Sequence, residues 1–273
     1  MVFRDERSGS TLLPLAGALL SDQTVASISS FFNFVIAKLA LRDKTAKPSF
    51  VVTDFSHALI NSVLATFNVE TIHNHLRRCI NTLDGAYTYA QLKATTFIRL
   101  CASHAIKAFA RSLCKLENSK QRRQKILSLF GILLNTKYLA GGLELFNNFI
   151  NIFADPEAEN SEILLDFLLD TNQSDTEDVD LLLENTGEND HSNDFLDEID
   201  VSNDPIIHQS PFSLMARSRN VFLDAIIQKQ DSDWQIKNPI FSRKIVLLLY
   251  KWFAYFPMWS SVLTDYLERY IVR

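Results

Sequence analysis

The chain has 273 residues, of which 47% are hydrophobic and 20 are phenylalanine, so it has ample apolar material for a packed core. Its 7 glycines and 7 prolines argue against a loop-rich all-β protein, and its 3 widely spaced cysteines cannot form a disulfide framework, which favours a reducing compartment. The net charge is −5, but the charges are distributed unevenly along the chain. Residues 155–204 contain 18 acidic and no basic residues. The rest of the chain contains 14 acidic and 27 basic residues, so its net charge is about +13.

The N-terminal part is predicted to alternate strands and helices. An apolar run over residues 12–20 predicts a buried strand, and apolar residues at helical spacing predict a helix from about residue 22 to 41. A second apolar run, residues 49–53, predicts a strand that ends at Asp54.

The next segments repeat this alternation and then become helical. We predict helices over residues 56–67 and 69–83, a strand over 95–101 and a helix over 103–116. Beyond residue 118 the spacing predicts helices alone, over the ranges 121–134, 140–153, 211–229, 239 or 241 to 255, and 258–273.

These elements predict a helix-rich α/β protein with a small, partly parallel sheet. We place a partial core at residues 1–117, a helical insertion at 118–154, an acidic disordered insertion at 155–208 and a helical part at 209–273. The disorder is expected because an acidic segment rich in Asn and Ser buries too little apolar surface to offset the entropy lost on ordering.

A membrane span is not expected. The longest strongly apolar stretch, residues 245–259, is interrupted by Lys251 and Pro257 and is shorter than the about 20 residues that cross a bilayer. The N-terminus is charged at once, so we expect no secretory signal and a soluble protein.

Asp54 is the first candidate functional residue. A carboxylate at the end of a strand and the start of a helix is how nucleases and transposases present oxygen ligands to Mg²⁺. The alternative is structural, because Asp54 or Ser56 could cap the following helix. The sequence contains no glycine-rich phosphate loop, no Gly-x-Ser-x-Gly and no His-Glu-x-x-His.

Cys101 and His104 have the two-residue gap that forms half of many zinc sites. His75 and Cys79, one helical turn apart, could supply the other two ligands of a tetrahedral zinc ion. A cysteine at a strand end and a histidine in a first helical turn are also ordinary core or cap residues, so both interpretations stay open.

A basic cluster begins the helix after residue 118. It consists of Lys120, Arg122, Arg123 and Lys125, which could contact DNA phosphates or act as a nuclear import signal. The alternative is a solvated helix face.

Leucines mix with carboxylates within residues 162–184 of the acidic insertion. Such composition suits a segment that docks on a partner protein, as an amphipathic helix or an added strand. The alternative is a weakly helical spacer.

Several short segments, in this order and spacing, resemble a known family. They are Leu13-Pro14-Leu15-Ala16, Ser21-Asp22-Gln23-Thr24, residues 48–61 around Asp54, residues 99–107 around Cys101 and His104, Asn238-Pro239, and residues 255–260. Together they are similar to the transposase domain of Mutator-like elements (MULEs), whose core is ribonuclease H-like and whose metal ligands are Asp, Asp and Glu.

The resemblance implies a role for each matching residue. Asp54 would be the second catalytic Asp, binding Mg²⁺ or Mn²⁺, and Cys101 and His104 would form the family's Cys-x-x-His motif. The family's first Asp, its Glu and its N-terminal zinc module find no match, which implies a chain truncated at both ends.

We therefore expect a transposase-derived, catalytically inactive protein that still associates with DNA and requires no cofactor. Its expected location is nuclear or cytoplasmic, with the nucleus favoured. One alternative is a helical protein-interaction module that has an acidic docking segment and does not bind nucleic acid. Another is an active nuclease that recruits its missing carboxylates from a partner chain.

Overall fold

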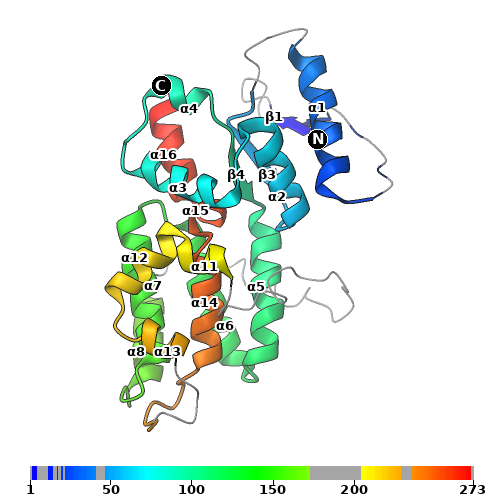
Figure 1. Cartoon of the computed structure of the whole chain (residues 1–273). Helices are drawn as coiled ribbons and strands as arrows, with labels where there is room; N and C mark the ends of the chain where they lie inside the picture. The colour runs from blue at the N-terminus through cyan, green and yellow to red at the C-terminus, as the bar shows by residue number, and fades with distance from the viewer. Residues whose placement is uncertain are drawn as a thin grey trace.

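A computed structural model describes residues 2–4, 12–14, 17, 20, 22–40, 47–172, 204–228 and 235–271. Helices dominate these residues, and a two-stranded parallel sheet lies among them (Figure 1). The predicted helix-rich α/β class is confirmed at this level. None of the helices in the described ranges combines the length and the apolarity needed to cross a membrane.

The N-terminal strands form a small sheet of their own. β1 (Val2–Arg4) pairs antiparallel with β2 (Leu12–Pro14). The strand predicted over residues 12–20 is therefore too long, since Gly17 and Leu20 lie outside it. α1 (Val25–Ala40) follows and packs against α2 (His57–Val63).

The parallel sheet pairs β3 (Phe50–Thr53) with β4 (Phe97–Leu100), and Thr53 lies opposite Leu100. The connection between them contains α2, a π-helical turn η2 (Leu64–Asn68), α3 (Ile72–Leu83) and α4 (Tyr89–Lys93). In the described residues β1–β2 and β3–β4 are separate sheets, so the ribonuclease H-like mixed sheet stays a prediction.

Four helices follow the sheet: α5 (Ala102–Leu116), α6 (Lys120–Asn135), α7 (Leu139–Ala154) and α8 (Ser161–Asn172). α8 lies inside the predicted disordered insertion, and that expectation is wrong for residues 161–172. Its Leu165 and Leu168 are buried against α6 and α7, and this burial offsets the cost of ordering the helix. Residues 173–203 of the insertion lie outside the described ranges.

The C-terminal part is also helical, with more breaks than predicted. Its helices are α11 (Pro205–Gln209), α12 (Pro211–Arg219), α13 (Leu223–Gln228), α14 (Arg243–Phe253), α15 (Phe256–Trp259) and α16 (Val262–Ile271). The single helix predicted over residues 211–229 is interrupted at Asn220. Its amide group donates to the side chains of Asn147 and Asn151, and its side-chain oxygen accepts from Phe222 N.

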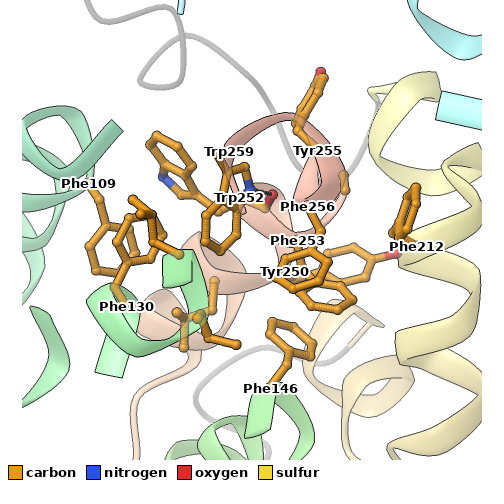
Figure 2. Close-up of a cluster of buried hydrophobic side chains, with 14 of the residues drawn as sticks. Phe109, Phe130, Phe146, Phe212, Tyr250, Trp252, Phe253, Tyr255, Phe256 and Trp259 are labelled. Atoms are coloured by element: carbon orange, nitrogen blue, oxygen red, sulfur yellow. Dashed lines mark hydrogen bonds between the residues drawn. The ribbon is translucent and has the colours of Figure 1, made fainter. Parts of the chain in front are cut away.

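Aromatic side chains form the centre of the helical part (Figure 2). Phe130 stacks on Phe109, with ring centroids 4.0 Å apart, and on Trp259 at 4.7 Å. Trp252 meets Phe130 edge-on, and its carbonyl accepts a hydrogen bond from Trp259 Nε1 at 2.8 Å. The core thereby ties α5 and α6 to α14 and α15.

Candidate functional site

The register of the parallel sheet brings Asp54 and His104 together. Both strands end at the same edge, where Cys101 N donates to Thr53 O at 2.9 Å. Asp54 is the first residue after β3, and His104 lies in the first turn of α5. As a result His104 Nδ1 lies 2.8 Å from Asp54 Oδ1, although the two residues are fifty positions apart in the chain.

This pair is open to solvent, since the side chains of His104 and Asp54 are 56% and 57% exposed. An exposed pair of this kind contributes about 0–1 kcal/mol to stability. Its position at the end of a parallel sheet is therefore of more interest than its energy.

The helix-capping alternative applies to Ser56 and not to Asp54. Ser56 is the N-cap of α2, and its hydroxyl accepts from Leu59 N at 3.5 Å. The carboxylate of Asp54 is turned toward His104 instead. Beside them, burial lowers the pKa of His57 to about 4, although Asp204 acts in the opposite direction.

The residues around Asp54 do not match the requirements of a two-metal centre. Mg²⁺ in such centres is held by two or three carboxylates, which also position the substrate phosphate. Across the described ranges no group of three or more His, Cys, Asp or Glu side chains converges on one point. Asp54 and His104 alone supply one carboxylate and one imidazole, a donor set that does not fit this chemistry.

The four-ligand zinc site, one of the two interpretations of these cysteines and histidines, is not assembled in the described residues. His75 and Cys79 are fully buried on α3, with His75 Nε2 3.7 Å from Cys79 Sγ, whereas Cys101 and His104 lie at the sheet edge. Burial raises the pKa of the Cys79 thiol to about 12, and across the described residues no group of three or more His, Cys, Asp or Glu side chains includes this thiol.

His75 belongs instead to a buried polar network. Its Nδ1 lies 3.1 Å from a Glu70 oxygen, which also binds the Arg78 guanidinium. Asn68 donates to the same Glu70 oxygen and to Thr96 O, just before β4. This network attaches α3 to the sheet and gives His75 a structural role.

Three members of the basic cluster predicted to contact DNA form contacts within the fold, two of them with acidic side chains. Arg122 pairs with Glu117 at 3.0 Å and with Glu162 of α8 at 3.2 Å, and Lys125 pairs with Asp166 of α8. Arg123 donates to the backbone carbonyl of Glu117 at 3.0 Å.

Lys120, the fourth member of that cluster, is exposed and forms no ion pair with any described residue. Helix α8 cannot easily leave Arg122 and Lys125, because Leu165 and Leu168 anchor it in the core. Two of the four charges of the cluster, those of Arg122 and Lys125, are thus neutralised within the fold.

A second basic row, which our sequence predictions missed, runs along α5. Lys107, Arg111 and Lys115 follow His104 at spacings of three, four and four residues, which places all of them on one helix face. Lys107 and Lys115 are exposed, Arg111 is half-buried, and α5 contains no Asp or Glu. The sequence indicated this row by the four-residue spacing of its basic residues within a predicted helix that contains no Asp or Glu.

No family model, no curated protein and no solved structure matches this chain.

Proposed function

We propose that this chain is a transposase-derived protein, related to the Mutator-like elements, that associates with DNA. The observation that supports this most is the contact between Asp54 and His104. Two segments that resemble separate motifs of the family form one site, because β3 and β4 are parallel neighbours in register. In this proposal β3 and β4 derive from the ribonuclease H-like sheet.

The DNA-binding surface in this proposal is the face of α5. Lys107, Arg111 and Lys115 span about 12 Å along the helix, at about 1.5 Å per residue, and the row begins at His104. A row of cations on a rigid helix suits the phosphates of a duplex, because each contact releases counterions. Lys120, at the start of α6, extends the cationic sequence beyond α5.

We further propose that the chain alone does not cleave or join DNA. Asp54 would be the family's second catalytic Asp, but no described acidic side chain joins it in a metal-binding group. Without a second carboxylate, the site lacks the ligands that hold and position two divalent ions.

Fluorescence anisotropy with a labelled duplex of arbitrary sequence tests the binding proposal. We expect the affinity to fall by a decade or more as NaCl rises from about 50 to 200 mM, the fall that a few phosphate contacts produce. An affinity that does not change with salt would favour a protein-interaction module over a DNA-associated protein.

A nicking assay with a supercoiled plasmid in Mg²⁺ or Mn²⁺ tests the proposed inactivity. We expect the plasmid to stay intact with the wild-type chain and with Asp54→Asn. Metal-dependent cleavage by the wild type that is lost in Asp54→Asn would instead identify an active nuclease.

The second candidate function, a protein-interaction module, is favoured by one specific observation. The outer face of α8 exposes Ile163, Leu164 and Phe167 to solvent. In this function the chain does not bind nucleic acid, and the outer face of α8 is its docking surface.

A further inference from the structure

Helix α8 has apolar side chains on two faces. On the inner face Leu165 and Leu168 are 1% and 8% exposed and pack against α6 and α7. On the outer face Ile163 is 69% exposed, Leu164 46% and Phe167 64%. Ile163 and Phe167 are one helical turn apart, so their side chains lie next to each other.

The inner face fixes the outer one in place. Because Leu165 and Leu168 are held in the core, α8 cannot rotate to bury Ile163 and Phe167 in their stead. A group of neighbouring large apolar side chains on a fixed helix is the kind of exposed patch that marks an interaction surface. Apolar residues spaced by one turn are also the pattern through which helices recognise partner helices.

The charges around this face determine which partner fits. Residues 155–172 contain six acidic and no basic residues. Arg122 and Lys125 neutralise Glu162 and Asp166 on the flank toward α6, whereas Asp170, beside Ile163 on the helical wheel, has no cationic partner among the described residues. A second copy of this chain would place these carboxylates opposite each other, which costs energy, while a basic partner would complement them.

We propose that the outer face of α8, formed by Ile163, Leu164 and Phe167 with Asp170, docks a short basic amphipathic helix of a partner protein. The apolar residues of that helix, one turn apart, pack against Ile163 and Phe167. Its Lys or Arg residues face Asp170 and the neighbouring acidic groups. This proposal does not depend on DNA binding, because it uses a different face of the molecule.

A synthetic amphipathic helix made only of Leu and Lys, labelled with fluorescein, serves as the probe. Two further peptides are needed: one of the same composition in an order that breaks the apolar face, and a Leu–Glu helix with the same apolar pattern. We expect the Leu–Lys helix to bind the full chain at least tenfold more tightly than either of the others, as judged by anisotropy.

The variant Ile163→Ser/Phe167→Ser should weaken that binding by tenfold or more, and Asp170→Lys should weaken it to a lesser extent. Leu214→Ser, at a 51% exposed apolar position on α12, is the matched control and should bind as the wild type does. Since the replaced side chains are exposed, all three variants should keep the wild-type melting temperature.

Equal binding of the Leu–Lys helix to the wild type and to Ile163→Ser/Phe167→Ser would overturn the proposal. So would equal affinity for the Leu–Glu helix, which would remove the charge argument. Concentration-dependent dimerisation of the wild type in sedimentation velocity, abolished by Ile163→Ser/Phe167→Ser, would show that the occupant is a second copy and would overturn it as well.

Discussion

The backbone positions Asp54 and His104 next to each other, and the contact between their side chains adds little to the stability of the fold. The parallel register places the two residues together, and both side chains are more than half exposed. We therefore predict that Asp54→Asn changes the free energy of unfolding by less than about 1 kcal/mol in a urea titration. A loss of several kcal/mol would mean that the pair helps to hold the sheet edge together.

His57 should make stability depend on pH. Burial lowers the pKa of His57 in the folded protein to about 4, whereas the pKa expected in the unfolded chain is about 6.5. The unfolded state then binds more protons between these values, so the free energy of unfolding contributed by His57 falls as pH drops from about 6.5 to 4. Melting temperatures of the wild type and of His57→Gln, recorded across this range, should show a shallower fall in the variant. Parallel pH profiles would contradict the assignment.

At the scale of elements, the contact between α7 and α15 depends on one glycine. A Cβ at Gly142 would lie 2.6 Å from Phe256 Cζ, and the Phe256 ring cannot move away because it is fully buried and stacked on Phe253. We predict that Gly142→Ala lowers the free energy of unfolding by about 1–3 kcal/mol through overpacking.

Gly141→Ala is the matched control, because a Cβ there meets nothing within 4 Å. It should raise the free energy of unfolding by up to about 1 kcal/mol through helix propensity. Equal effects of the two substitutions, measured by urea denaturation, would be inconsistent with the close approach of the two helices.

Substitutions at two adjacent leucines of α8 can test whether this helix is part of the core. Leu165 is 1% exposed and Leu164 is 46% exposed. We predict that Leu165→Ala lowers the free energy of unfolding by about 2–5 kcal/mol and Leu164→Ala by less than about 1 kcal/mol. If both changed stability by the same small amount, α8 would not be part of the core, and the original expectation of disorder would hold for it.

Most helices and both strands of the parallel pair were predictable from periodicity. The breaks at Asn220 and Ser260 were not, because Asn220 is held by two asparagines about seventy residues away, and Ser260 is extended within a buried aromatic segment. α8 was missed because its composition is acidic, while its stability comes from the burial of two leucines against α6 and α7.

The candidate site was predictable in its residues but not in its geometry. Asp54 and His104 were identified separately, as a strand-end carboxylate and as half of a zinc motif. Their contact requires the parallel register of β3 and β4, which no local pattern specifies.

At the scale of the whole molecule, basic residues are concentrated on two helices in contact with each other, α5 and α6. In the α6 cluster Arg122 and Lys125 are paired with acidic residues of α8. The row on α5 lies on a helix that contains no Asp or Glu of its own. The prediction from local charge density favoured α6, because Glu162 and Asp166, the α8 partners of Arg122 and Lys125, lie some forty residues away in the chain.

The central claim is that the chain binds DNA through α5. The most direct test is the slope of log Kd against log[NaCl] for a labelled duplex, measured for the wild type, for Lys107→Glu/Lys115→Glu and for the control Lys93→Glu, an exposed lysine on α4. We predict that the α5 variant binds at least tenfold more weakly, with a slope reduced by about 2, and that Lys93→Glu keeps at least two thirds of the wild-type slope and affinity. Identical slopes for the wild type and the α5 variant would contradict the claim.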